Sequence, residues 1–291
     1  MEGFRQVKAM VNNMMTVGIV GLGLIGGSLA KAYKSSGVAT VLGYDLDAST
    51  KEFACLSGVL DGTLTRETLR SCDLILFAIP PRAVVRFIRD HADDFTANPM
   101  LIDCAGTKSV VCDAVFPLAK EHGFLFLGGH PMAGSHHSGF KYSRADLFVG
   151  APMVLVPPTF DDIRLLDRAK SLLAPAGFGH ISVTSAEDHD RMIAFTSQLA
   201  HVVSNAYIQS PTAGSHKGFS AGSYQDLTRV AWLDADMWTE LFLENSKYLI
   251  PEIDTLIACL QDYRNSIAAG DAQALRSRLN YGKHRKEEVD G

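Results

Sequence analysis

Paired cysteines, long apolar runs and an excess of basic residues are all missing from this chain of 291 residues. Its five cysteines form no CxxC pair and no zinc-type spacing, which excludes a disulfide framework and favours the reducing cytoplasm. No segment approaches the roughly 20 consecutive apolar residues of a transmembrane helix. The formal net charge is −5, and the one basic run, 283–286, is followed by two glutamates, so nucleic-acid binding is not expected.

The bulk of the sequence is typical of two packed domains. Hydrophobic residues make up 47% of the chain and charged residues 20%, which supplies enough apolar side chains for full cores. The length is also that of about two domains. Residues 1–14 have no pattern of their own and are predicted to be a leader. Because the hydrophobic pattern changes after Thr184, we predict an α/β domain over 15–184 and a helical domain over 185–291.

The first domain alternates short apolar runs with helix-like stretches. Such runs, stopped by glycine or proline, are typical of strands buried on both faces of a parallel sheet. They cover 16–20, 40–44, 74–79, 100–103, 124–127, 153–156 and 179–183. Helix-like stretches lie between them, for example at 82–91 and 109–122. This alternation predicts a Rossmann-type, doubly wound α/β sheet.

A glycine-rich turn directly follows the first run. Gly21, Gly23 and Gly26 form the pattern GxGxxG between a strand and a helix, and Asp45 ends the second strand 19 residues beyond Gly26. The glycines permit a tight turn, close approach of a pyrophosphate and close helix–strand packing. The helix N-terminus offers N–H groups to the phosphates, and the carboxylate suits the ribose hydroxyls of NAD. The predicted NAD-binding residues are Gly21, Gly23, Leu24, Ile25, Gly26, Asp45 and Pro80.

Beyond residue 184 the sequence shows only helical periodicity. Apolar residues recur at helical spacing over 192–206 and again over 249–260. Trp232 and Trp238 are predicted to lie in the core. A helical domain of about a hundred residues has little apolar material to cover itself, so we predict a homodimer. The residues expected near the shared core are Leu249, Ile253, Leu256 and Leu260.

Three polar side chains are candidates for chemistry. His130 follows a strand and a Gly-Gly pair, where a histidine can take a proton from a substrate hydroxyl. A hydrogen bond to the loop backbone is an equally open alternative. Arg229 stands among few charges and can hold a carboxylate, although an ion pair with Asp226 or Asp234 is the more common arrangement. His201 lies on the first long helix of the second domain, where a packed or capped histidine is the ordinary case.

Motifs spread over both domains resemble those of one enzyme family. They are Gly128–Gly134 with Ser138-Gly139, His189-Asp190 with 196–201, 226–231 with Met237-Trp238, and 243–245. In this order they are similar to the motifs of prephenate dehydrogenases, the tyrosine-biosynthesis enzymes, with departures at Gln198 and Ala200. The resemblance runs from about Thr16 to about Asn265. Neither a chorismate mutase region nor an ACT-type extension is found, so a monofunctional form is expected.

The resemblance implies NAD-dependent oxidative decarboxylation of prephenate to 4-hydroxyphenylpyruvate. It implies that His130 accepts the proton of the ring hydroxyl. Arg229 would hold a carboxylate of the dianionic substrate, and His201 would line the side-chain end of the pocket. This chemistry needs orientation, a base and anion binding, and no metal.

Two positions depart from the family pattern within the expected site. The family often has serine where this chain has Gly106, so the hydroxyl of Thr107, or a water, is expected to substitute. It often has glutamate where this chain has His136, and a histidine there adds positive charge for a dianion. A metal site at His136-His137 is not expected, because no third ligand has a recognisable spacing.

Other functions remain open at this point. Arogenate, the amino-acid counterpart of prephenate, differs only at one end of its side chain and would give tyrosine directly. A β-hydroxyacid dehydrogenase would carry a catalytic lysine on the first helix of the second domain, where this chain has none. A non-catalytic NAD-binding regulatory protein is weakly favoured by Gly106 and disfavoured by His130 and Arg229.

Overall fold

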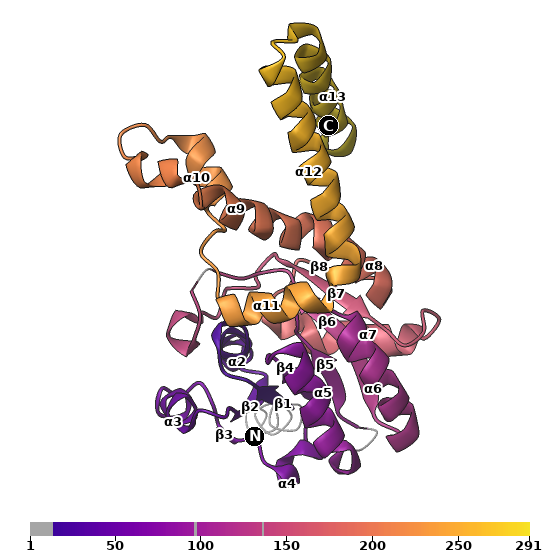
Figure 1. Cartoon of the computed structure of the whole chain (residues 1–291). Helices are drawn as coiled ribbons and strands as arrows, with labels where there is room; N and C mark the ends of the chain where they lie inside the picture. Colours follow the sequence, from indigo (N-terminus) through magenta and orange to yellow (C-terminus); the bar gives the residue numbers. More distant parts are fainter. Residues whose placement is uncertain (1–13, 96–97, 136) are drawn as a thin grey trace.

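The chain folds into a sheet domain and a helical domain that rises from one edge of the sheet (Figure 1). The computed structural model describes residues 14–95, 98–135 and 137–291. The predicted leader lies outside these residues, except for Met14. The last strand ends at Val183 and the first helix of the second domain begins at Ala186.

One eight-stranded sheet forms the centre of the first domain. Its order is β3-β2-β1-β4-β5-β6-β7-β8, and all neighbours are parallel except β6 and β7. The strands are β1 (Met15–Val20), β2 (Ala39–Tyr44), β3 (Gly62–Thr63), β4 (Leu74–Phe77), β5 (Met100–Asp103), β6 (Leu125–Pro131), β7 (Pro152–Val156) and β8 (His180–Val183). Strand order reverses at β1, which lies between β2 and β4. This confirms the predicted doubly wound fold.

Each face of the sheet packs against its own helices. Successive strand residues point to opposite faces, so Ile19 enters one apolar core and Val20 the other. One core includes side chains of α2 (Leu24–Ser36), α3 (Ala48–Leu56), α7 (Ile163–Leu173) and the short turn η3 (Ala174–Ala176). The other includes α4 (Arg66–Leu69), α5 (Pro81–Asp90), η1 (Ala92–Asp94) and α6 (Ser109–His122). Burial on both faces is why the strands read as unbroken apolar runs.

Strand β6 is longer than the sequence predicts. The apolar run suggests a strand that stops before the two glycines, but Gly128–Pro131 continue it in antiparallel register with Met153–Val156 of β7. A Cβ at Gly129 would lie 2.4 Å from a backbone carbonyl oxygen of β5, so glycine is required for this approach. The expectation that His130 follows the strand is therefore wrong, because His130 lies within it.

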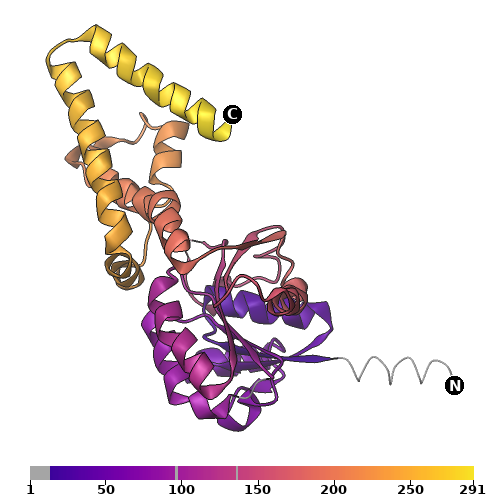
Figure 2. The same ribbon diagram turned by 90° about the vertical axis from the view of Figure 1, so that its right-hand side faces the viewer.

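The second domain consists of helices that cover little of each other. They are α8 (Ala186–Ile193), the π-helical η4 (Ala194–Leu199), α9 (Ala200–Ile208), η5 (Pro211–Ser215), α10 (Gly222–Thr228), α11 (Ala235–Glu244), α12 (Ser246–Ala268) and α13 (Ala272–Asp290). One further turn, η2 (Phe140–Tyr142), belongs to the loop after β6. Helix α11 lies along the sheet domain, whereas α12 and α13 form a hairpin that projects away from it (Figures 1 and 2).

A buried polar network holds the base of the helical domain together. The predicted helical run over 192–206 contains the π-helical turn, within which Gln198 donates to the carbonyl oxygen of Leu241 at 3.1 Å. The Asn245 amide donates to Gln198 at 2.7 Å and to the carbonyl oxygen of Asp190 at 2.8 Å. These bonds join α8 and the π-turn to the α11–α12 junction.

Many apolar side chains of the helical domain remain exposed. Trp232 is 76% exposed, so its predicted place in the core is wrong. Ile257 and Leu260 of α12 are 57% and 58% exposed. The helical period shows which side of a helix is apolar, but not whether the chain itself covers that side. None of the helices in the described part of the chain combines the length and apolarity needed to span a membrane.

Candidate active site

The glycine-rich turn between β1 and α2 is shaped to receive a phosphate. Gly21 has a φ of 89°, a left-handed conformation that favours glycine. A Cβ at Gly26 would lie 1.8 Å from the carbonyl oxygen of Gly21, so a larger residue there would break the turn. At Gly23, in contrast, an added Cβ would meet no other described residue within 4 Å beyond its chain neighbours. The turn is therefore closed toward the protein and open where a pyrophosphate would approach.

The groups around this turn also fit a dinucleotide. Leu24 and Ile25 begin α2, and no side chain caps that helix end, so its first N–H groups are free of side-chain partners and can bind a phosphate. Asp45 accepts a hydrogen bond from the backbone N–H of Leu22 at 2.6 Å, which holds its carboxylate against the turn. Pro80 is exposed at the start of α5, after the neighbouring strand β4. All of the predicted cofactor-binding residues thus border the carboxyl ends of β1, β2 and β4.

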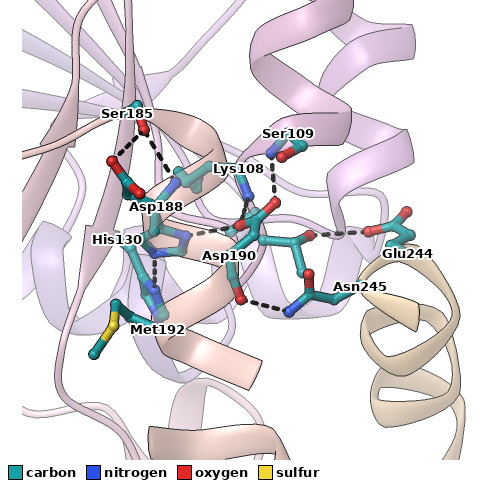
Figure 3. Close-up of polar contacts among 12 residues, drawn as sticks. Lys108, Ser109, His130, Ser185, Asp188, Asp190, Met192, Glu244 and Asn245 are labelled. Atoms are coloured by element: carbon teal, nitrogen blue, oxygen red, sulfur yellow. Dashed lines mark hydrogen bonds and ion pairs between the residues drawn. The ribbon is translucent and has the colours of Figure 1, made fainter. Parts of the chain in front are cut away.

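His130 lies at the same edge of the sheet, near the carboxyl end of β6. Its Nδ1 is 2.9 Å from Nε2 of His189, which belongs to α8 of the helical domain. The Nδ1 of His189 is 2.8 Å from Oδ1 of Asp190. Figure 3 labels the two ends of this row, His130 and Asp190, with Asp190 next to Lys108 and Ser109 at the start of α6. The alternative bond from the His130 ring to a loop backbone is not found among the described residues, because the ring contacts His189 instead.

Beneath His130, a buried ion pair joins three segments of the sheet domain. Lys108 and Asp103 are both 0% exposed and bonded to each other. The Lys108 ammonium also donates to the carbonyl oxygen of Gly129 at 2.6 Å, and Asp103 accepts from the Gly129 N–H at 3.0 Å. The end of β5, the start of α6 and β6 are therefore held together directly next to His130. Removing one partner would leave a buried charge unpaired, which is strongly destabilising.

Asp190 joins the helical domain to the sheet domain. Its carboxylate accepts from the backbone N–H groups of Lys108 at 2.7 Å and Ser109 at 2.8 Å, at the N-terminus of α6 (Figure 3). Burial raises the pKa of Asp190, but hydrogen bonds from His189, Ser109 and Lys108 outweigh this effect and leave the pKa below its ordinary value. Asp190 is therefore ionised at neutral pH.

Both histidines of this group are neutral at neutral pH. Burial lowers the pKa of His130 well below 6.5, and the nearby His189 and Lys108 lower it further against the opposing effect of Asp190. Burial also lowers the pKa of His189 and outweighs its hydrogen bond to Asp190. A neutral imidazole keeps one nitrogen lone pair, so His130 has the protonation state that a proton acceptor needs.

His201 and Arg229 both belong to the helical domain, and they lie near enough to interact electrostatically. The Nδ1 of His201 bonds to the carbonyl oxygen of Ser197 at 2.9 Å, and its ring packs on Trp238 with centroids 3.9 Å apart. Burial lowers the pKa of His201, and the nearby Arg229 lowers it further against the hydrogen bond to Ser197. Among the described residues Arg229 forms no ion pair, so the alternative of a local pair is not found. No hydrogen bond or ion pair of the described residues links His201 and Arg229 to His130.

Thr107 is buried and faces the helical domain. Its hydroxyl donates to Oε2 of Glu244 at 3.0 Å, and Glu244 also accepts from the Arg82 guanidinium at 3.3 Å. Burial raises the pKa of Glu244. The Thr107 hydroxyl thus donates its proton in a hydrogen bond that joins the sheet domain to the helical domain. A Cβ at Gly106 would meet the side chain of Leu241 at 3.4 Å, an ordinary contact, so a serine would fit there.

His136, the remaining predicted substrate-binding residue, lies outside the described residues. The adjacent His137 is exposed and stacks on Tyr142 with ring centroids 4.3 Å apart. Within the described ranges, no three histidine, cysteine, aspartate or glutamate side chains are grouped closely enough to hold a metal ion.

Three polar residues of this site received no role from the sequence, although two of them, His189 and Asp190, stand in a family motif. His189, Asp190 and Lys108 are buried and are all within the hydrogen-bonded group around His130. The available signal was the pair of ionisable residues in the first helix of the second domain, together with a lysine five residues beyond Asp103 at a strand end. Ionisable side chains are rarely buried without partners. Which side chains become partners is decided by the tertiary fold, so the sequence alone does not show it.

A neutral histidine at the edge of the sheet where a dinucleotide fits indicates the class: this is a nucleotide-dependent dehydrogenase of two domains. Family comparison narrows that class. The profile of "Prephenate dehydrogenase, nucleotide-binding domain" matches residues 29–182, and that of "Prephenate dehydrogenase, dimerization domain" matches residues 185–281. The chain belongs to the prephenate dehydrogenase family.

Individual relatives agree with this assignment. The chain is 30% identical over 268 residues to a cyclohexadienyl dehydrogenase of Zymomonas mobilis, covering 89% of this chain and 90% of the relative. It is 28% identical to the prephenate dehydrogenase of Bacillus subtilis, covering 95% of this chain and 76% of that protein. The structure of A. aeolicus prephenate dehydrogenase with hydroxyphenyl propionate and NAD+ matches with a TM-score of 0.78 and 28% identity, covering 95% and 99% of the two chains.

Proposed function

We propose that this enzyme catalyses the NAD-dependent oxidative decarboxylation of prephenate to 4-hydroxyphenylpyruvate in tyrosine biosynthesis. The observation that carries the proposal is the neutral, half-buried His130 at the sheet edge that also bears the open phosphate turn of Gly23. A base and a dinucleotide-binding turn at one edge are what the removal of a proton and a hydride from one carbinol group requires.

The proposed reaction of prephenate with NAD neither consumes nor releases a net proton. His130 accepts the hydrogen bond of the ring hydroxyl, and with it the developing positive charge, while the hydride leaves the same carbon. Bound NAD supplies the hydride acceptor. The ring carboxylate departs as carbon dioxide and leaves its bonding electrons in the ring, which becomes aromatic. The proton drawn toward His130 returns to the phenol oxygen.

The helical domain supplies the anion-binding side of the proposed site. Arg229 is exposed and has no ion-pair partner among the described residues, so its guanidinium is available to a substrate carboxylate. His201, packed on Trp238, lines the side-chain end in this proposal. Thr107 and His136 remain proposed substrate-binding residues, the former through the lone pairs that its bond to Glu244 leaves free.

The proposed cofactor is NAD and not NADP. The Asp45 carboxylate stands at the turn, where it would accept hydrogen bonds from ribose hydroxyls and repel a 2′-phosphate. The residue that follows is the exposed Leu46, so no cation at that position compensates for the repulsion.

The proposed assembly is a homodimer formed through the helical domain. A dimerization-domain profile covers that domain, and exposed apolar side chains lie along its longest helix, α12. Five unpaired cysteines suit the reducing cytoplasm, which is the proposed location.

Arogenate is the second candidate substrate, because one relative carries the broader name cyclohexadienyl dehydrogenase. One assay separates the possibilities: formation of NADH is followed with prephenate and then with arogenate, against NAD and against NADP. Turnover of prephenate with NAD supports the proposal, and exclusive turnover of arogenate replaces it with the second candidate. Absence of turnover with either substrate would refute both and leave a non-catalytic nucleotide-binding role.

A further inference from the structure

A row of buried side chains runs behind His130 and ends at a carboxylate. His130 contacts His189 at 2.9 Å, and His189 contacts Asp190 at 2.8 Å. His189 and Asp190 are 3% and 2% exposed, so no bulk water competes for these bonds. Because this contact occupies Nδ1 of His130, the proton acceptance proposed above falls to Nε2 on the opposite side of the ring, and His189 takes no direct part in it.

The direction of each hydrogen bond in this row follows from the carboxylate. An ionised Asp190 can only accept, so the proton of neutral His189 is on Nδ1 and its Nε2 carries a lone pair. The contact between the two rings then requires the proton on Nδ1 of His130. The lone pair of His130 is therefore on Nε2. The reverse arrangement would set a lone pair of His189 against the carboxylate.

We propose that His189 is a positioning residue that holds His130 in its Nδ1–H tautomer, with the Nε2 lone pair free to accept the substrate proton. This inference rests on the proposed function, in which His130 is the proton acceptor. His189 touches neither substrate nor cofactor in this scheme and acts only through His130.

The surrounding charges favour this arrangement. The groups that face the histidine pair are Lys108, Asp103 and Asp190, from the sheet domain and from α8. Lys108 and Asp103 are paired with each other. Asp190 is thus the carboxylate that can orient the row. In a comparable carboxylate–histidine pair, the wrong tautomer costs up to about 10⁴-fold in turnover.

Two substitutions at position 189 distinguish a role in orienting His130 from a role in filling space. His189→Leu fills similar space but has no acceptor for the His130 Nδ1–H. His189→Gln can place an amide oxygen near the former Nε2 and accept that bond. We expect the leucine variant to lose about a hundredfold or more in kcat with little change in KM, and the glutamine variant to recover at least about tenfold of that loss. His180→Leu, at an exposed histidine of β8, is the matched control and should leave both constants unchanged.

Nitrogen NMR of the histidine-labelled wild-type protein tests the tautomer without any substrate. The resonances of His130 are assigned by their disappearance in His130→Ala. We expect a protonated Nδ1 and an unprotonated Nε2 in the wild-type protein, and a mixture of tautomers in His189→Leu. This measurement needs no folded variant at position 189 for its main result.

The outcomes distinguish failure of this inference from failure of the proposed function. A wild-type His130 protonated on Nε2 overturns the inference, as does a folded leucine variant with unchanged kcat or a glutamine variant no better than leucine. If the wild-type protein turns over neither prephenate nor arogenate, the proposed function fails, whereas the NMR result still decides whether His189 sets the tautomer of His130.

Discussion

The two domains of this enzyme are packed to different degrees. In the sheet domain, helices cover both faces, and core side chains such as Ile19, Ile75 and Phe77 are 0% exposed. In the helical domain, Leu241 and Leu249 are buried, whereas Ile257 and Leu260 are more than half exposed. Burying one such side chain contributes about 1.5–3 kcal/mol. The first domain is thus complete within one chain, and the second has apolar surface that a partner would cover.

The candidate site belongs to both domains at their junction. The sheet domain supplies the phosphate turn and His130, and α8 supplies His189 and Asp190. In the proposed function, the more completely packed domain carries the proton acceptor and the cofactor turn, and the less completely packed domain orients His130. The following predictions test this division, beginning with the largest expected effect.

Removing the proton acceptor should have the largest effect. We expect His130→Ala to lower kcat by about 10²–10⁴-fold with a small change in KM, because a general base acts in the transition state. Since the base form is required and burial lowers the pKa of His130, wild-type activity should persist below pH 6.5 and fall as the pH drops through that lowered pKa. The alanine variant should lose this dependence. His180→Ala serves as the control, and near-normal turnover of His130→Ala would disprove the assignment.

Cofactor preference tests the sheet domain alone. We expect the enzyme to prefer NAD over NADP by about a hundredfold or more in kcat/KM, because two like charges in contact cost several kcal/mol. Asp45→Ala should narrow that preference at least about tenfold, mainly through better use of NADP. Asp90→Ala, at an exposed carboxylate at the end of α5, should leave the preference unchanged. Equal use of both cofactors by the wild-type enzyme would contradict the role of Asp45.

Removal of the Arg229 guanidinium tests the proposed anion-binding role of the helical domain. Arg229→Ala should raise KM by about 10–100-fold with a smaller effect on kcat, because a charged hydrogen bond made both before and during hydride transfer contributes about 1.5–3 kcal/mol. Steady-state kinetics with prephenate would measure this. Arg285→Ala on the exposed α13 is the control. A fall in kcat without a change in KM would show that Arg229 acts in the chemical step.

The oligomeric state of the protein tests the difference in packing between the two domains. Light scattering at micromolar concentration should give the mass of a dimer. Leu260→Glu should shift it toward the monomer and lower the melting temperature, because it places a charge in the proposed shared core. Gln261→Glu, one residue further along α12, should change neither. A monomeric wild-type protein would show that the exposed face of α12 serves another purpose.

A serine at position 106 should produce the smallest effect. The side chain of Leu241 leaves room for it, and the added hydroxyl lies in the loop next to Thr107. We expect Gly106→Ser to raise kcat about twofold to tenfold, the contribution of one neutral hydrogen bond to the transition state. Gly282→Ser on α13 is the control. A loss of activity would indicate that Thr107 or a water already fills that role.

The sequence predicts the sheet well and its boundaries less well. Strands buried on both faces leave continuous apolar runs, which is why seven of the eight were found. The two-residue strand β3 is too short to leave a pattern. The end of β6 was missed because glycine, histidine and proline do not favour strands, and only its pairing with β7 extends it.

Within the candidate site, the sequence marks residues by their local motifs, His189 and Asp190 included, but does not show which of them contact each other across the fold. His130 is marked by its own neighbours in the chain. His189 contacts it from 59 residues away, and Asp190 reaches the Lys108 backbone from 82 residues away. Contacts over such separations are made by the tertiary fold, so a single sequence without related sequences does not reveal them. Exposure also depends on the tertiary fold, so the sequence did not show that the side chain of Trp232 is exposed.

The position of Asp190 has a consequence for the response of this enzyme to heat. One carboxylate both binds the N-terminus of α6 and ends the row of hydrogen bonds behind His130. Contacts between domains open at lower free energy than the core of a sheet. As the temperature rises, separation of α8 from α6 would therefore release the histidine row while the sheet is still folded. Inactivation should then begin below the melting transition and reverse on cooling.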